Sequence, residues 1–166
     1  MILTIWRHGE AGQAASDRQR ELTDRGMDDI GFGCQQFHTA CMARALPHPQ
    51  LILHSPWVRT SQTAQLVASA FSHAQLRAHA ALQPGAGMPG VDALLEEEQR
   101  DRHCEHLLLV SHQPMVSRLV ERYLGERGQV PSLSPGGLAT LALEAVSPGG
   151  AKLLFWALPP EYEASI

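Results

Sequence analysis

The chain has 166 residues, 44% of them hydrophobic and 18% charged, with a formal net charge of −4 at pH 7; this composition is typical of one soluble globular domain and argues against nucleic acid or an anionic membrane as the main partner. No apolar run approaches the roughly 18 residues that a membrane helix needs, and no secretory signal pattern opens the chain. The three cysteines lack metal-type spacing and favour a reducing compartment, so we expect a cytoplasmic protein.

Residues 2–6 form a short, uncharged, apolar run that predicts a buried strand. Arg7, His8 and Gly9 follow where this strand would end. In open α/β sheets, ligands bind beyond the carboxyl ends of the strands. A guanidinium beside an imidazole, with a glycine that permits close backbone approach, suits an oxyanion such as phosphate. Taken alone, the three residues are better explained as polar residues leaving a strand, so the assignment depends on the rest of the chain.

A polar, alanine-rich loop is expected over 10–22, followed by a helix that Thr23 caps and Asp24 supports in its first turn. Apolar residues then recur at spacings of three and four, as on one helix face: Met27, Ile30, Cys34, Phe37 and Cys41. The two cysteines are therefore expected in the core. Three glycines each cost this helix up to about 1 kcal/mol of stability, so tertiary packing must stabilise it: Gly26, Gly31 and Gly33. The helix is expected to end at 47–49.

Residues 50–54 predict a second buried strand, and Ser55-Pro56 is a favourable helix start with serine as N-cap. Arg59 falls in the first turn of that helix, where a cation is unfavourable for the helix dipole. An anion bound at that end would make the electrostatic interaction of Arg59 favourable, so a ligand explains Arg59 better than helix stability does.

Residues 75–78 predict a short third strand, and 84–90 predict a flexible loop rich in proline and glycine. Asp92 is expected to cap a short helix that runs to about Arg102. The apolar side chains of this helix are expected to face inward: Val91, Leu94 and Leu95. Its glutamates are expected to form a solvated face: Glu96, Glu97 and Glu98.

Residues 107–110 form the most apolar run of the chain, which is typical of a central parallel strand buried on both faces. Ser111-His112-Gln113-Pro114 ends this strand and opens a helix that Gly125 terminates. Residues 139–146 and 152–158 predict a closing hairpin, followed by an irregular tail.

The chain therefore runs three times from strand to polar terminus to helix, and each junction carries basic groups. Right-handed crossovers bring such junctions to one edge of a parallel sheet. Two arginines and two histidines would meet there beside two helix N-termini: Arg7, His8, Arg59 and His112. Phosphate fits this set better than carboxylate, because four donor groups exceed what one carboxylate can use.

These residues resemble the histidine phosphatase superfamily, which includes the cofactor-dependent phosphoglycerate mutases. The similar blocks stand in the family's order: Arg7-His8-Gly9, then Arg59 with Gln62-Thr63-Ala64, then Ser111-His112. The short SixA-type phosphohistidine phosphatases are the most similar subfamily, because their loop after the nucleophile resembles this one: Ala14-Ala15-Ser16-Asp17, Arg20, Leu22-Thr23 and Gly26.

The resemblance implies a phosphoglycerate mutase-like fold, a three-layer α/β/α single domain over 1–166 with a mostly parallel sheet. It implies that His8 attacks phosphorus, that Arg7 and Arg59 neutralise the phosphoryl oxygens, and that His112 stabilises the transition state. It also implies a phosphohistidine intermediate hydrolysed by water, with no metal and no cofactor. The expected substrate is phosphohistidine on a protein, for example a phosphotransfer domain, and the enzyme is expected to be a monomer.

One departure from the family concerns the general acid. Many relatives carry an acidic proton donor before the third helix, but no Asp or Glu lies between His73 and Val91. Without a donor, alkyl phosphate esters are poor substrates, since protonation of the leaving group is typically worth 10²–10⁴-fold. Phosphohistidine depends less on an acid, which favours the SixA-type function. Glu10 is a candidate substitute donor, although a structural contact with Arg7 explains it better.

Three further residues are candidates for contact with phosphate or substrate: Gly9, Gln113 and Arg20. For Arg20, a salt bridge to Glu10 or Glu21 is an equally good explanation. His103, Cys104 and His106 have poor spacing for a tetrahedral zinc site. Two other functions remain open, a small-molecule phosphomonoesterase and a module that binds phosphate or phosphohistidine without turnover.

Overall fold

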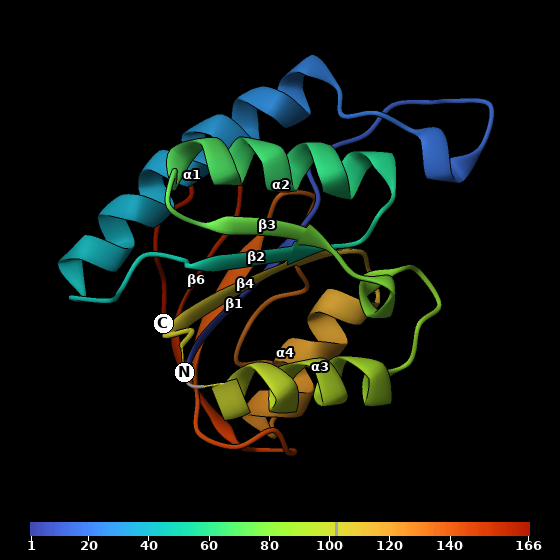
Figure 1. Cartoon of the computed structure of the whole chain (residues 1–166). Helices are drawn as coiled ribbons and strands as arrows, with labels where there is room; N and C mark the ends of the chain where they lie inside the picture. Colours follow the sequence, from blue (N-terminus) through green and yellow to red (C-terminus); the bar gives the residue numbers. More distant parts are fainter. Residues whose placement is uncertain (102) are drawn as a thin grey trace.

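One six-stranded sheet lies between two layers of helices (Figure 1) in the computed structural model, which describes residues 1–101 and 103–166. The strand order is β3-β2-β4-β1-β5-β6. The strands are β1 (Ile2–Arg7), β2 (Leu51–His54), β3 (Gln75–Ala78), β4 (His106–Ser111), β5 (Leu138–Leu143) and β6 (Ala151–Ala157). Strands β1 to β4 are parallel to one another, β5 pairs antiparallel with β1, and β6 pairs antiparallel with β5, which confirms the expected α/β/α fold with a mostly parallel sheet.

Helices cover both faces of this sheet (Figure 1). One face carries α1 (Asp24–Ala43) and α2 (Val58–Ala70), and the other carries α3 (Met88–Asp101) and α4 (Met115–Leu124). Two short 3-10 turns complete the elements, η1 (Asp17–Gln19) and η2 (Ala80–Leu82). None of the helices in the described part of the chain is long and apolar enough to cross a membrane.

Strand β1 shows how the sheet divides the interior into two cores. Successive side chains of a strand point to opposite faces. Leu3 and Ile5 therefore join the core under α3 and α4, while Trp6 joins the core under α1 and α2. Strand β4 lies between β2 and β1 and is buried along its whole length, as its apolar sequence predicted.

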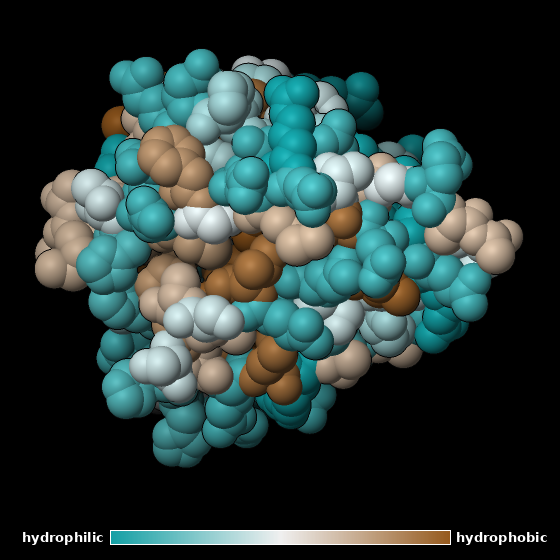
Figure 2. Space-filling model, turned by 90° about the horizontal axis from the view of Figure 1, so that it is seen from above, coloured by the Kyte–Doolittle hydropathy of each residue, from teal (hydrophilic) through white to brown (hydrophobic). Residues whose placement is uncertain are grey.

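Helix α1 begins where its cap was predicted. The Thr23 hydroxyl oxygen accepts a hydrogen bond from the Gly26 amide at 3.0 Å. Cys34 and Cys41 are buried, but Met27 is 40% exposed and does not belong to the apolar face. The surface over α1 and α2 is mainly hydrophilic, with smaller hydrophobic areas between polar side chains (Figure 2).

Two predicted helix starts were wrong. Helix α2 begins at Val58 with Trp57 as N-cap, because the Ser55 amide still bonds the Val110 carbonyl of β4 and the Ser55 hydroxyl contacts His112. Helix α3 begins at Met88, so the predicted loop 84–90 ends earlier; a proline in the first turn of a helix lacks only an N–H that has no helical partner.

Asp92 therefore lies inside α3 rather than capping it. Its carboxylate accepts hydrogen bonds from Arg122 Nη2 at 2.6 Å and from the Tyr123 hydroxyl at 2.7 Å, which ties α3 to α4. The predicted end of this helix at Arg102 lies outside the described residues.

The C-terminal hairpin is confirmed as β5 and β6, and the tail after it is irregular except for a bridge between Trp156 and Ser165. The tail still contributes to the core. Tyr162 is 2% exposed, and its hydroxyl donates to the Gly136 carbonyl at 2.9 Å.

Candidate active site

A cavity of about 300 Å³ lies at the carboxyl ends of β1 and β4. The register pairs Arg7 with Ser111, so the residues that follow the two strands emerge side by side. The loops after β1 and after β3 extend from this same end of the sheet (Figure 1). The lining residues come from all three predicted junctions, from these loops and from the segment before β5: Arg7, His8, Glu10, Ala11, Asp17, Arg20, Arg59, Pro84, His112, Gln113 and Pro135.

His8 is held as a neutral imidazole whose Nε2 is unprotonated. Its Nδ1 lies 2.7 Å from the Gly9 carbonyl oxygen, which can only accept, so Nδ1 carries the proton. Its Nε2 accepts a hydrogen bond from Arg59 Nε at 3.2 Å. Burial, together with the charges of Arg59 and Arg7, lowers the pKa of His8 to about 4. At neutral pH, Nε2 is therefore an unprotonated nitrogen inside a cationic cavity.

Arg59 is 5% exposed and uses its whole guanidinium group. Besides the His8 contact, Nη1 donates to the Asp17 backbone carbonyl at 2.7 Å, and Nη2 contacts Asp17 Oδ2 at 3.4 Å. The guanidinium carbon lies 5.0 Å from the centre of the Trp57 ring. The second residue of α2 thus points at His8; the anion that was expected to explain a cation at this helix start stays a prediction.

Arg7 is held by a network behind the cavity. Its Nη1 donates to the Leu133 carbonyl at 3.0 Å, and Gln113 Nε2 donates to the same oxygen at 2.9 Å. The Gln113 side chain also bonds Ser117 at the start of α4, so its amide is occupied by protein groups. Arg7 Nε is buried and has no partner among the described residues, which leaves a donor for an anion.

His112 faces His8 at 5.3 Å between ring centres. Its Nε2 lies 2.8 Å from the Ser55 hydroxyl oxygen, and its buried Nδ1 has no partner within the described chain. Burial and the positive charges of His8 and Arg59 lower the pKa of His112 to about 3. Sequence reasoning missed Ser55, which it assigned to a helix cap; the available signal was its position directly after β2, at the same sheet edge as the other junctions.

Gly9 does not line the cavity. Its amide donates to Thr63 Oγ1 at 3.1 Å, and an added Cβ would lie 3.0 Å from Ile30 Cγ1 and 3.1 Å from the Gly26 carbonyl oxygen. The structure therefore explains the glycine by close packing of the chain against α1, whereas the sequence analysis explained it by approach of phosphate.

Arg20 and Glu10 line the cavity with partners that the sequence did not predict. Arg20 Nη1 pairs with Asp17 Oδ1 at 3.1 Å, and its Nε donates to the Gly12 carbonyl at 2.7 Å. The suggested bridges from Arg20 to Glu10 or Glu21 are therefore wrong. Glu10 accepts a hydrogen bond from the Thr23 hydroxyl at 2.9 Å instead of pairing with Arg7.

The described residues contain no group of three or more His, Cys, Asp or Glu side chains that could hold a metal ion. His106 is fully buried and contacts Thr4 Oγ1 at 2.8 Å and the Pro47 carbonyl oxygen at 2.7 Å. It is thus a core residue with satisfied ring nitrogens, which accounts for it without zinc.

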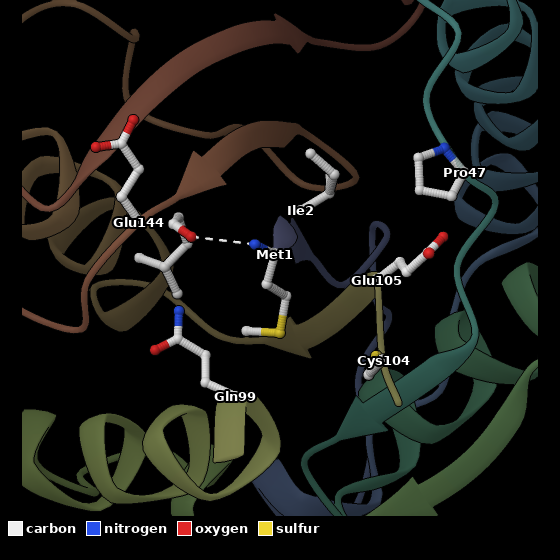
Figure 3. A pocket seen from close by; sticks show the side chains of 8 residues that line it. Met1, Ile2, Pro47, Gln99, Cys104, Glu105 and Glu144 are labelled. Atoms are coloured by element: carbon white, nitrogen blue, oxygen red, sulfur yellow. Dashed lines mark hydrogen bonds between the residues drawn. The ribbon is translucent and has the colours of Figure 1, made fainter. Parts of the chain in front are cut away.

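A larger cavity, of about 770 Å³, lies at the opposite end of the sheet beside Met1 and Ile2 (Figure 3). Ile2 and Arg7 are the two ends of β1, about 17 Å apart at the usual rise per residue. Its lining residues include Glu105 and Glu144 but no arginine or histidine, and the Met1 ammonium group beside it donates to the Leu143 carbonyl at 3.2 Å. The smaller cavity, which arginines and histidines line, is therefore the better candidate site for an anion.

Comparisons with known proteins identify the family and the fold of the chain. No protein-family model matches the chain. A phosphohistidine phosphatase SixA homologue of Haemophilus influenzae is 30% identical over 146 residues, which cover 85% of this chain and 87% of that protein. The structure of the protein histidine phosphatase SixA complexed with tungstate has a TM-score of 0.77 at 22% identity and covers 96% of this chain and 97% of that one. The α-ribazole phosphatase of Shigella flexneri has a TM-score of 0.67 at 18% identity and covers 92% and 94%.

Proposed function

The chain belongs to the SixA-type histidine phosphatases, and from this membership we propose that it removes the phosphoryl group from phosphohistidine on a protein, through a phosphohistidine intermediate on His8. The observation that carries the proposal is the state of His8, a buried neutral imidazole whose Nε2 lone pair lies among arginines. Such a nitrogen can attack phosphorus only while it is unprotonated.

In the proposed first step, His8 Nε2 forms a bond to phosphorus while the bond from phosphorus to the substrate nitrogen breaks. The electron pair of the broken bond stays on the leaving imidazole. Arg59 exchanges its contact with Nε2 for a phosphoryl oxygen, and Arg7 supplies its unpaired Nε. His112 offers Nδ1 to the charge that develops on the phosphoryl group. These are preorganised donors, which is the main source of rate enhancement in such transfers.

In the proposed second step, water attacks the phosphohistidine at position 8. The phosphorus–nitrogen bond breaks, inorganic phosphate leaves, and His8 regains its lone pair. Arginines and histidines supply the charge stabilisation, so the proposal uses no metal and no cofactor. We assign Gly9 and Gln113 supporting roles: the Gly9 carbonyl fixes the tautomer of His8, and Gln113 holds the Leu133 carbonyl that positions Arg7. Arg20 remains a proposed phosphate contact at the cavity wall.

The choice of phosphohistidine rests on the leaving group. An alkoxide needs a proton from an enzymic acid, and the segment between His73 and Val91 contains no carboxylic acid. Imidazole is a better leaving group than an alkoxide, so its departure depends less on an enzymic acid. The tungstate in the SixA structure is a tetrahedral oxyanion, which agrees with a phosphoryl site in this family. A small-molecule phosphomonoesterase is the second candidate, because the carboxylate of Glu10 lines the cavity and could act as a donor.

We further propose that residues 1–166 act as one catalytic domain, as a monomer in the cytoplasm, on a phosphorylated protein such as a phosphotransfer domain. The free thiols of Cys34, Cys41 and Cys104 support a reducing compartment. The net charge of −4 supports a protein substrate rather than nucleic acid or membrane.

The test is to trap the phosphoryl group on the enzyme. Wild-type protein mixed with a radiolabelled phosphohistidine peptide and quenched in alkali should carry acid-labile label, and His8→Ala should carry none. His112→Ala should still bind phosphate but transfer it roughly 10²-fold more slowly, the scale of one lost transition-state donor. The reactions are run with a chelator, because the mechanism uses no metal.

A panel of phosphohistidine peptide, phosphoramidate and alkyl phosphates separates the candidate functions. Faster turnover of alkyl phosphates would contradict the phosphohistidine assignment. Tight phosphate binding with no phosphoenzyme would favour a binding module. Phosphatase activity retained by His8→Ala would contradict the assignment of His8 as the nucleophile.

A further inference from the structure

A carboxylate lies at the wall of this anion-binding cavity. Asp17 belongs to η1, in the loop after the nucleophile, and its side chain is 58% exposed. A negative charge beside a phosphoryl site repels the substrate unless a positive charge lies between them. The arginines already have phosphoryl oxygens to neutralise, so the presence of Asp17 needs its own explanation.

The contacts place the Asp17 carboxylate and the His8 ring on the same arginine. Its Oδ1 accepts from Arg20 Nη1 at 3.1 Å, and its Oδ2 contacts Arg59 Nη2 at 3.4 Å. The Nε–H and Nη2–H groups of an arginine lie along one edge of the planar guanidinium group. On that same edge, Arg59 Nε donates to His8 Nε2 at 3.2 Å. The carboxylate and the nucleophile are therefore neighbours on one arginine.

The protonation state of Asp17 excludes the role of general acid. The hydrogen bond from Arg20, with a further contribution from Arg59, lowers the pKa of Asp17. The group is thus ionised at neutral pH and can only accept hydrogen bonds. A phosphate ester gains nothing from it, because the leaving oxygen needs a proton and the phosphoryl dianion is repelled.

Phosphohistidine is different, because its leaving group is an imidazole. The ring carries phosphorus on one nitrogen and, when protonated, a hydrogen on the other. When His8 Nε2 attacks, the phosphorus–nitrogen bond breaks with its electron pair on the ring, which leaves as neutral imidazole and keeps its other hydrogen. A nearby carboxylate favours the protonated ring before the transfer, and this cationic ring is the better leaving group.

We propose that Asp17 determines specificity for phosphohistidine by accepting a hydrogen bond from the imidazolium ring of the substrate. The inference rests on the phosphatase function proposed above. It also accounts for the absent general acid, because a leaving group that brings its own proton needs an acceptor rather than a donor.

The test compares two substrates on two variants. kcat/KM is measured for a phosphohistidine peptide and for p-nitrophenyl phosphate, whose leaving group needs no proton. Asp17→Asn keeps the shape but removes the charge, and should lower the ratio of the two kcat/KM values about tenfold or more, the scale of one charge-assisted hydrogen bond. Asp28→Asn is the matched control: this exposed aspartate on α1 is not among the residues that line the cavity, so the ratio should not change.

Other outcomes would overturn the inference. A parallel loss on both substrates would mean that Asp17 only orders Arg20 and Arg59, and an unchanged ratio would mean that it has no part in specificity. Inhibition by inorganic phosphate, measured on both variants, shows whether the arginines still bind the anion. The wild-type rate on the peptide tests the proposed function separately: if it is absent, that function fails and the inference fails with it.

Discussion

At the scale of single residues, the candidate site contains two histidines that burial keeps neutral and that different partners hold in place. The Gly9 carbonyl fixes the tautomer of His8, and the Ser55 hydroxyl is the partner of His112. Both rings are buried beside arginines, and burial is the largest cause of their lowered pKa values. The positive charge of the cavity therefore comes from guanidinium groups, while the proposed mechanism uses the neutral imidazoles for bonds to phosphorus and to a phosphoryl oxygen.

The first prediction concerns the titration of His8. Its pKa of about 4 lies below the usual value of 6.5, so the ring should stay neutral from pH 8 down to about 5 and gain a proton only below that. Arg59→Ala removes one positive charge and some burial, and should raise the pKa without carrying it above 6.5. NMR titration of the ring, with His112→Ala used for assignment, measures both values. A wild-type midpoint near 6.5 would contradict the neutral nucleophile.

The second prediction concerns Ser55. Ser55→Ala removes the partner of His112 Nε2 and should lower kcat by roughly 2- to 10-fold through loss of one hydrogen bond, with KM little changed. Ser69→Ala is the control, because that exposed hydroxyl donates only to the Gln65 carbonyl on α2. Steady-state kinetics of the two variants and the wild type give the kcat and KM values to be compared. Equal effects would mean that Ser55 has no part in positioning His112.

At the scale of elements, α1 shows how packing compensates for poor helix propensity. Its three glycines differ in their surroundings. An added Cβ on Gly26 would meet the Glu10 backbone, and one on Gly33 would lie 2.5 Å from the Tyr162 ring. Gly31, by contrast, faces open space. Two of the glycines therefore permit close contacts with the loop after the nucleophile and with the C-terminal tail, and the third has no such reason.

The third prediction follows from this difference. Gly31→Ala should raise the free energy of unfolding by up to about 1 kcal/mol, the difference in helix propensity. Gly33→Ala should lower it by about 1–3 kcal/mol, because the ring of Tyr162 must move. Urea denaturation of both variants provides the comparison. If Gly33→Ala were as stable as Gly31→Ala, the tail would not be packed on α1.

At the scale of the whole molecule, the buried histidines couple stability to pH. The pKa values of His8 and His106 are lowered to about 4 and that of His112 to about 3, mainly by burial. In the unfolded chain these groups titrate near 6.5. Between pH 6.5 and 4 the unfolded state therefore binds protons that the native state does not. The free energy of unfolding must fall as the pH falls through this range.

The fourth prediction gives the size of this effect. Each of the three histidines should contribute a slope of up to about 1.4 kcal/mol per pH unit between pH 6 and 4. His106→Gln should make the slope shallower by one proton. Denaturation curves at several pH values measure the slopes. A stability that stays constant between pH 6.5 and 4.5 would contradict the buried neutral state of the three rings.

The sequence by itself was sufficient for the architecture and for the main members of the candidate site. Apolar runs such as 107–110 identified the central strands, because a parallel strand buried on both faces has no polar period. The polar residues after each run identified Arg7, His8, Arg59 and His112, because strand ends meet at one edge of the sheet. These inferences depend on local pattern and on topology, which a sequence carries directly.

Only the tertiary structure decided what each polar group contacts. Ser55 has the sequence of a helix cap, yet its hydroxyl bonds a histidine 57 residues away. Asp17 belongs to a polar loop, yet its carboxylate joins Arg20 and Arg59 at the cavity. Gly9 was expected at phosphate but packs against α1. Hydrogen bonds of this kind form between groups far apart in the chain, so their partners depend on how the folded layers place them and not on any local propensity.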